Sequence, residues 1–398
     1  MNYKSGRLIS FTLAPIVAML ITIMPTTGKA IPAWARKYKV PCSSCHFGGT
    51  YKLTKFGRDF MWRGFRTAEA EGLEVDEALD GLKFTDYFSI SQSWSYTVDP
   101  DANVDTSFRT ARLGVTGGGP LYDNFSFLLG YTLAPSAGIS NGHLEYNTDH
   151  AADSYLFVRA GLLSPEMFTL LFLGRPSITG GNVGGGITSS PSSNTSGIAV
   201  GYRTSGNTIL EAGYVNGANS TATGNDDSNH KDIFLTIEQW IDDEGSNVGA
   251  YYVNGKARVP ASTNPVNPAW DMDYDRLGVM ASFMRDNFTV EGGWFTGSND
   301  LQGGGSRDPE GFYVGGAYNF TEDLTGFVTW EDFDRNLVVS PVIPATSTSR
   351  TKSLTFGVQQ RIRQIGRIQG SVSLTDSTLI NGASSSRTVY SIGLGWGF

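Results

Sequence analysis

Two cysteines separated by two residues and followed directly by a histidine form the most chemically distinctive stretch of this sequence. They are Cys42, Cys45 and His46, in the order Cys-Ser-Ser-Cys-His. This spacing is typical of covalent attachment of a c-type haem, because each thiol can add across one vinyl group of a porphyrin. The adjacent imidazole is then held against the ring, where it can bind the iron as the proximal ligand. We therefore expect one haem c at Cys42 and Cys45, with His46 on the iron.

Three other uses of the two cysteines fit the sequence less well. A disulfide between them would close a very small loop and gain little stability. A zinc site would need two more ligands, and the whole chain has two cysteines and four histidines. A thioredoxin-like redox pair would need a strand–helix–strand setting, which the surrounding sequence does not predict.

The N-terminus has the pattern of a secretory signal peptide. A short basic region precedes the apolar stretch 8–24, and small residues suited to cleavage by a signal peptidase follow it. We therefore expect residues 1–30 to be a signal peptide and the exported mature chain to begin at Ile31. No other segment is long and apolar enough for a transmembrane helix.

The remaining composition indicates an all-β membrane protein. The chain has 49 glycines, 12% aromatic residues and only 17% charged residues, whereas a water-soluble α/β protein of this size usually has more charge and long helical periods. Short runs instead alternate with period two, as where Leu354, Phe356 and Val358 alternate with Ser353, Thr355, Gly357 and Gln359. Such alternation is typical of strands between lipid and a wet lumen. Sixteen strand candidates follow Phe84, which predicts a porin-like, 16-stranded antiparallel transmembrane β-barrel in a bacterial outer membrane.

Turn lengths predict the topology of this barrel. Short connections are expected at seven places: 117–124, 148–153, 204–207, 242–245, 285–287, 321–323 and 364–366. They alternate with longer connections, as short periplasmic turns alternate with longer outer loops. This parity requires strands near 142–147 and 154–163 and makes the glycine-rich residues 164–196 the third outer loop. In general porins the third loop folds inward and narrows the channel; a loop on the surface is the alternative.

The last residues carry a further barrel signal. The final strand places apolar and aromatic residues on one face and ends on an aromatic residue, with the pattern Tyr390, Ile392, Leu394, Trp396 and Phe398. This pattern resembles the C-terminal signal by which outer-membrane barrels are recognised for insertion.

The segment 31–66 differs in charge from the rest of the chain. It carries eight basic residues and one acidic residue, whereas the whole chain has a net charge of −8. A segment of this size is too small for a stable core without a cofactor or a partner. We expect it to dock within the acidic barrel, where Glu211, Glu238 and Glu291 are candidate partners; a solvated basic face is the alternative.

These features divide the chain into four parts. They are a signal peptide at 1–30, a monohaem cytochrome c segment at 31–66, a short helical connector at 67–82 and the barrel at 83–398.

The second axial ligand of the iron has several candidates. Met61 lies in the same segment as the cysteines, and a His/Met pair would raise the reduction potential. His143 and His150 lie in or near the fourth predicted strand and could reach a haem inside the barrel, whereas His230 falls in a predicted outer loop. A methionine in an aromatic-rich stretch is often only a packing residue. Met61 and His143 are the leading distal candidates, with His150 beside His143 and an open position as the alternatives.

The chain resembles the outer-membrane cytochrome-porin fusions, in which one c-type haem segment precedes a sixteen-stranded barrel. The resemblance rests on the following residues: Trp34-Ala35-Arg36, Cys42 to His46, Leu53, Phe56-Gly57-Arg58, Phe60 and Gly64-Phe65. Departures occur at Lys37-Tyr38-Lys39, Phe47 and Tyr51. They leave haem attachment intact, but they alter the surroundings that tune the potential of a haem and the access to it.

The resemblance implies electron transfer across the outer membrane. Extracellular Fe(II) would give electrons to the haem, which would pass them to a periplasmic c-type cytochrome, and the protein would then be an Fe(II)-oxidising oxidoreductase. A conduit for another extracellular donor or acceptor is one alternative. A diffusion porin whose haem segment anchors or gates the channel is the other, because a barrel of sixteen strands is wide enough for an aqueous channel. Serine is plentiful and histidine is scarce, and the sequence predicts no strand–turn–helix setting for a catalytic serine.

Overall fold

The computed structural model describes residues 33–48, 52–67, 84–101, 106–122, 124–134, 138–149, 152–163, 195–216, 230–259, 262–263, 266–267, 270–300, 306–335, 348–362 and 366–397. The predicted signal peptide and the terminal Phe398 lie outside these residues. The predicted connector also lies outside them, apart from Thr67.

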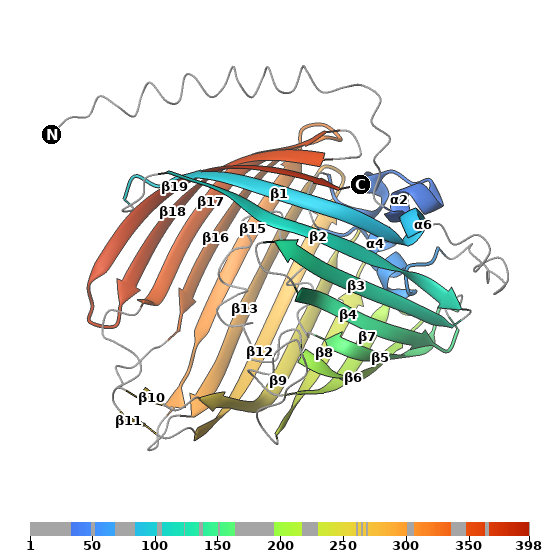
Figure 1. The fold of residues 1–398 in the computed structure, drawn as a ribbon, viewed down its shortest axis with the longest axis horizontal. Helices are drawn as coiled ribbons and strands as arrows, with labels where there is room; N and C mark the ends of the chain where they lie inside the picture. The colour runs from blue at the N-terminus through green and yellow to red at the C-terminus, as the bar shows by residue number, and fades with distance from the viewer. Residues whose placement is uncertain are drawn as a thin grey trace.

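The described strands form a closed antiparallel barrel (Figure 1). Sixteen long strands make up its wall: β1 (Phe88–Val98), β2 (Thr106–Tyr122), β3 (Phe125–Ala134), β4 (Gly138–Asn147), β5 (Tyr155–Leu163), β6 (Thr195–Arg203), β7 (Thr208–Asn216), β8 (Lys231–Trp240), β9 (Asn247–Val259), β12 (Trp270–Arg285), β13 (Phe288–Asp300), β15 (Glu310–Asn319), β16 (Leu324–Asp334), β17 (Thr348–Ile362), β18 (Gly366–Leu379) and β19 (Ser384–Gly397). The short β14 (Ser306–Arg307) pairs with β13, and β10 (Ser262–Thr263) pairs with β11 (Val266–Asn267). β1 closes the barrel against β19, with Trp94 opposite Leu394. The predicted sixteen-stranded barrel is confirmed.

Side chains alternate between the two faces of the wall. On β8, Ile233, Leu235 and Ile237 are 44–50% exposed on the outer face, whereas Phe234 and Glu238 are buried on the inner face. Because side chains of a strand point alternately to opposite faces, this pattern gives an apolar surface outside and a mixed aromatic and polar lumen inside.

Tight turns join neighbouring strands at one end of the barrel, as predicted, but one turn is shorter than expected. β2 continues to Tyr122, so the glycines at 117–119 lie in the strand and not in a turn over 117–124. These glycines make room for nearby aromatic rings, since a Cβ on Gly118 would lie 3.0 Å from the Trp34 ring and one on Gly119 would lie 2.8 Å from the Tyr87 ring. Gly118 and Gly119 therefore allow the Trp34 and Tyr87 rings to pack closely against β2, and they do not form a turn.

The predicted strands near 142–147 and 154–163 are present as β4 and β5. Most of the predicted loop, at 164–194, lies outside the described residues, and its last two residues belong to β6. The first strand begins at Phe88, later than expected, because Phe84–Tyr87 form the short helix α6.

The N-terminal segment forms three short helices: α2 (Ala33–Tyr38), α3 (Cys42–Cys45) and α4 (Lys55–Trp62). We call the described residues 33–67 the plug. The Thr54 hydroxyl caps α4 by accepting a hydrogen bond from the Gly57 N–H at 3.2 Å, and Gly64 follows its end with a φ of 68°. Among the described residues no helix is long and apolar enough to cross a membrane.

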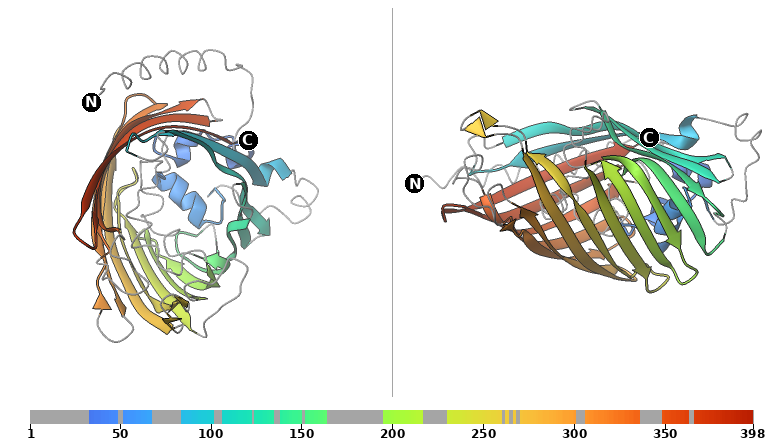
Figure 2. Two further views of the ribbon diagram at one scale, coloured as in Figure 1. Left: turned by 60° about the vertical axis from the view of Figure 1, so that its left-hand side comes forward. Right: turned by 90° about the horizontal axis from the view of Figure 1, so that it is seen from below.

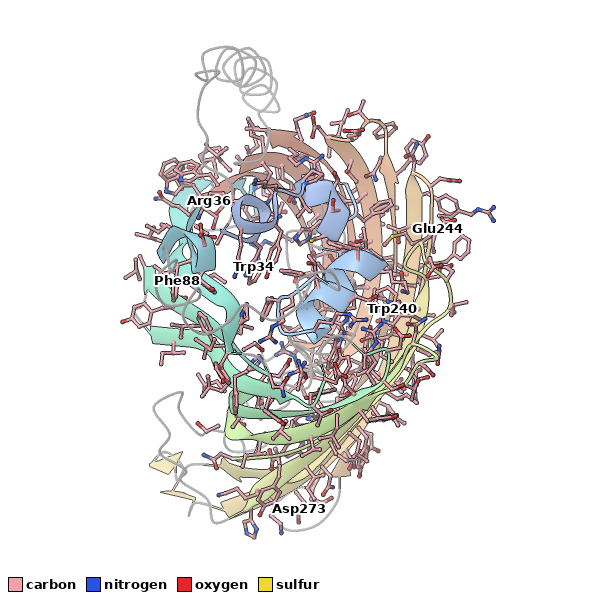
Figure 3. All side chains as sticks on the ribbon, turned by 90° about the vertical axis from the view of Figure 1, so that its right-hand side faces the viewer. Trp34, Arg36, Phe88, Trp240, Glu244 and Asp273 are labelled. Atoms are coloured by element: carbon pink, nitrogen blue, oxygen red, sulfur yellow. The ribbon has the colours of Figure 1, made fainter. Side chains whose placement is uncertain are left out.

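The plug lies inside the barrel at the end with the tight turns (Figures 2 and 3). Arg66 Nη2 donates to the Tyr122 and Phe125 carbonyls, at 2.6 and 2.9 Å, at the β2–β3 turn. Arg63 donates to the Ala152 carbonyl at the β4–β5 turn, at 3.4 Å. The plug is therefore attached to the rim of the barrel as well as to its wall.

Candidate functional site

The two cysteines occupy the single turn of α3, where local hydrogen bonds fix their spacing. The His46 N–H donates to the Cys42 carbonyl at 2.9 Å, and His46 itself has an extended backbone that pairs with Leu53. The Thr54 N–H then donates to the Cys45 carbonyl at 3.0 Å. The chain therefore folds back over the motif and brings α4 onto it, while the two thiols stay free of a disulfide.

A small cavity adjoins the motif. It is lined by both thiols, the imidazole and four aromatic side chains, among other plug residues: Cys42, Cys45, His46, Trp34, Tyr38, Phe56 and Phe60. Its volume is about 80 Å³, which is less than a porphyrin occupies. The donor set and the aromatic walls fit a c-type haem, and part of the wall would have to move outward to admit one.

Aromatic rings of the plug pack closely around this cavity. Trp34 stacks on Phe65 with ring centroids 4.6 Å apart, and Phe60 meets both rings edge-on at 5.9 Å. The Trp34 Nε1–H donates to the Gly118 carbonyl on β2 at 2.7 Å. The barrel wall therefore orients one side of the cavity.

Burial sets the protonation state of the motif. It lowers the pKa of His46 to about 4, with the positive charges of Arg367 and Arg361 acting in the same direction. It also raises the pKa of Cys45 to about 11 and raises the pKa of Cys42. At neutral pH the imidazole is therefore neutral, which is the form that binds iron.

Two buried ion pairs join the plug to the inner wall. Lys52 Nζ lies 2.9 Å from Glu291 Oε2, and Arg58 Nε donates to Glu238 Oε1 at 2.9 Å. Glu238 and Glu291 are thus confirmed as partners of the cationic segment. Glu211, the third predicted partner, instead lies 3.1 Å from Arg159 of the barrel wall.

Trp62 forms one apolar contact between the plug and the wall. Its side chain is 1% exposed and belongs to the aromatic cluster of the lumen. The Phe157 ring lies 5.1 Å away, and the Tyr155 hydroxyl donates to the Trp62 carbonyl at 2.8 Å. This contact fixes the end of α4 against β5.

Neither distal candidate lines the cavity. Met61 lies on α4 and packs against the apolar cluster of the lumen. His143 is buried on β4, His150 lies outside the described residues, and His230 precedes β8 at the opposite end of the barrel. The haem iron and its distal ligand both stay predictions.

The sequence did not predict which barrel residues lie near the motif. Arg361 Nη1 donates to the Gly48 carbonyl at 3.4 Å, while its Nε donates to Asp323 Oδ1 at 2.7 Å. Local sequence gives no signal for this contact, because residues 48 and 361 meet only after the barrel closes.

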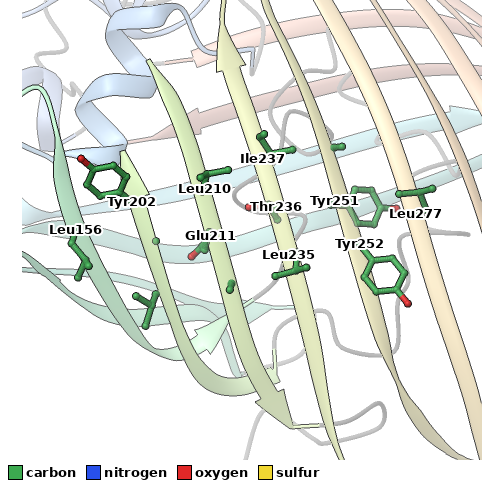
Figure 4. A pocket seen from close by; sticks show the side chains of 14 residues that line it. Leu156, Tyr202, Leu210, Glu211, Leu235, Thr236, Ile237, Tyr251, Tyr252 and Leu277 are labelled. Atoms are coloured by element: carbon green, nitrogen blue, oxygen red, sulfur yellow. The ribbon is translucent and has the colours of Figure 1, made fainter. Parts of the chain in front are cut away.

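A larger apolar groove lies elsewhere, on the outer face of β5–β9 and β12 (Figure 4). It is lined by Leu156, Tyr202, Leu210, Leu235, Ile237 and Tyr252, among others. These side chains belong to the apolar outer surface, and none comes from the plug.

Solved structures similar to this chain are porins and other outer-membrane proteins. OmpT of Vibrio cholerae matches with a TM-score of 0.58 and 13% identity over 78% of this chain and 97% of that one. An anion-selective porin from Comamonas acidovorans matches at 0.55 and 12% identity, over 78% and 98%. OprB of Pseudomonas putida matches at 0.56 and 11% identity, over 81% and 96%. No protein-family model and no curated protein sequence matches the chain. At these identities the comparisons show a shared porin barrel fold.

Proposed function

We propose that this protein is an outer-membrane electron-transfer barrel whose plug carries one covalent haem c. The observation that carries the proposal is the placement of Cys42, Cys45 and His46 around an aromatic cavity at the mouth of the barrel. In outer-membrane barrels the short turns face the periplasm. The haem would therefore lie at the periplasmic mouth, with lipid around the apolar outer face of the wall.

The plug residues would have distinct tasks. The two thiols would hold the porphyrin, and the neutral His46 imidazole would bind its iron as the proximal ligand. The aromatic walls would exclude water from the ring, and the buried ion pairs of Lys52 and Arg58 would keep the motif in place. A bound haem would supply one-electron chemistry between an extracellular donor such as Fe(II) and a periplasmic c-type cytochrome.

A diffusion porin with a haem-bearing gate is the second candidate function. The fold comparison favours it, because the similar structures include a protein described as an anion-selective porin. In that case the plug would narrow the channel without sealing it, and the haem would stabilise the plug.

Two measurements on the purified full-length protein separate these functions. The haem absorption spectrum is taken before and after addition of Fe(II), and flux of a small sugar is measured in liposomes. Reduction of the haem by Fe(II) in a sealed barrel supports electron transfer, whereas free sugar flux without reduction supports the porin. The Cys42→Ala/Cys45→Ala variant is the control for attachment: haem staining on a denaturing gel should disappear, and a persistent band would refute covalent attachment.

A further inference from the structure

Two arginines face each other on the inner side of the β17–β18 hairpin, beside the plug. Arg361 and Arg367 are direct cross-strand neighbours, and Gln359 and Gln369 form the next pair on the same face. Arg361 marks this face as the inner one, because it donates to the Gly48 carbonyl of the plug. Like charges directly opposite each other destabilise a sheet. The Asp323 carboxylate lies 2.7 Å from Arg361 Nε.

The two glutamines present buried amide groups on this face. Gln359 is 0% exposed, and neither Nε2 nor Oε1 of its side chain has a hydrogen-bond partner among the described residues. Gln369 is 4% exposed, and its Oε1 likewise has no such partner. Buried amides are nearly always hydrogen-bonded in native proteins. The face is thus suited to a polar group from outside the protein chain.

Arg367 lies close to the strands that border the start of the plug. A Cβ on Gly395 of β19 would make only ordinary contacts, at 3.8 Å from Arg367 Nε and 3.8 Å from the Ser93 Cβ, so the Arg367 side chain lies near β1 as well as on β18. On β1, the Ser89 hydroxyl accepts a hydrogen bond from the Ala33 N–H of α2 at 2.8 Å. The arginines, the amides and the haem motif therefore belong to one region of the lumen. Gly48, which Arg361 contacts, is separated from His46 by a single residue of the chain.

We propose that Arg361, Arg367 and the Gln359–Gln369 pair form a carboxylate site that receives the propionate groups of the haem. The inference rests on the proposed haem at Cys42 and Cys45. A guanidinium presents paired donors that match a carboxylate, and such charge-assisted hydrogen bonds are stronger than neutral ones. The amide nitrogen of Gln359 supplies a further donor. The barrel wall thereby fixes the ring that the plug holds by its thiols.

This site has a consequence for the haem potential. A positive charge beside the propionates disfavours the oxidised haem, which carries one more positive charge than the reduced form. Replacing Arg367 by glutamine removes that charge while leaving the cysteines untouched. We expect the ratio of reduced to oxidised haem to fall about tenfold at a fixed applied potential, which corresponds to about 59 mV for a one-electron couple.

The experiment uses the full-length protein in detergent, with the matched control Arg285→Gln. Arg285 is an exposed arginine at the end of β12, in the turn that leads to β13. Potentials are measured by spectroelectrochemistry, and the propionate bending band is followed by resonance Raman spectroscopy. Arg367→Gln should lower the potential and move the band, Arg367→Lys should do both to a smaller extent, and Arg285→Gln should do neither.

Two results would overturn the proposal. One is a potential and a band in Arg367→Gln equal to those of the control, and the other is a shifted potential with an unmoved band, which indicates only a distant charge. Should Arg367→Gln fail to form a heat-modifiable barrel, Gln359→Met decides: a moved band supports the site and an unmoved band refutes it. Failure of the proposed haem attachment, on which the inference rests, is recognised separately, since the wild-type protein would then show no haem absorption.

Discussion

The Arg58 guanidinium of the plug lies against the Glu238 carboxylate of the barrel wall, with Nε and Oε1 2.9 Å apart and both side chains at most 3% exposed. Bulk water solvates neither group, so each charge is stabilised by the opposite charge of the other. Loss of one partner from a buried pair typically costs about 3–5 kcal/mol, whereas exchange of both for apolar residues is often neutral. The pair therefore specifies where the plug sits.

Glu238→Gln should loosen the plug. It leaves the Arg58 charge buried without its counter-ion, and we expect the docking free energy of the plug to weaken by about 3 kcal/mol. Protease cleavage within 33–67 of the detergent-solubilised protein should become faster, while the double variant Arg58→Met/Glu238→Leu should recover much of the protection.

Asp273→Asn is the matched control for this experiment. Asp273 pairs with Lys256 at 2.9 Å, and both side chains are well exposed, so we expect a change within about 1 kcal/mol. Equal cleavage rates in Glu238→Gln and Asp273→Asn would show that the buried pair does not hold the plug.

Gly57→Ala should impair the proposed haem attachment. A Cβ at this position would overlap the Cys45 carbonyl, which belongs to the backbone and cannot rotate away. The packing of α4 on α3 would be lost, so haem staining of the purified protein should fall sharply while the barrel stays heat-modifiable. Gly206→Ala is the control, because the nearest atom to its Cβ would be the Thr204 hydroxyl at 3.6 Å. Full staining in Gly57→Ala would contradict the observed packing.

Much of the barrel followed from the sequence because each strand carries its own signal. Apolar and polar residues alternate with period two, and burial on β8 reproduces that alternation residue by residue. The predicted end of β2 was wrong, because contacts with residues distant in the sequence determine where this strand ends. Gly118 and Gly119 look like turn residues, but they serve the packing of Trp34 and Tyr87 from elsewhere in the chain.

The sequence predicted the types of residue at the site, but it did not predict which plug residue pairs with which wall residue. The basic charge of the plug predicted acidic partners in the lumen, and Glu211, Glu238 and Glu291 were the candidates. The choice of Glu238 for Arg58 depends on barrel closure and on the depth of the plug, which no local pattern encodes. The same holds for Arg361, whose contact with Gly48 joins distant parts of the sequence.

Docking of the plug should strengthen as the pH rises from 7 to 9.5. Burial lowers the pKa of Lys37 to about 8, with Asp86 raising it and Arg66 lowering it further, against an ordinary value near 10.4 in an unfolded chain. Between these values the unfolded state binds more protons than the folded state, so stability increases with pH. The Lys37 ammonium lies 4.1 Å from the centroid of the Tyr87 ring and has no hydrogen-bond partner among the described residues.

Protease cleavage of the plug at several pH values tests this expectation. Cleavage, corrected for the protease's own pH profile, should slow as the pH rises, and Lys37→Met should abolish the trend. Lys39→Met is the control, because Lys39 is exposed on the same segment. The pH is kept below 9.5, since burial raises the pKa of the neighbouring Tyr38 and Tyr87 and their titration would act in the opposite direction. If the pH trend persists in Lys37→Met, another titrating group causes it.

Trp62→Ala should release the plug without unfolding the barrel. The ring is 1% exposed, packs on Phe157 at 5.1 Å and lies 4.3 Å from the Arg159 guanidinium, and loss of a buried tryptophan typically costs about 3–5 kcal/mol. The strand pairings stay intact, so an unheated sample should still migrate differently from a heated one, because a closed barrel has no free strand edge. Single-channel conductance in a planar bilayer should increase if the plug obstructs the lumen. Trp330→Ala, at an outward position on β16 that is 46% exposed, provides the comparison, and equal conductance in the two variants would mean that Trp62 does not hold an obstructing plug.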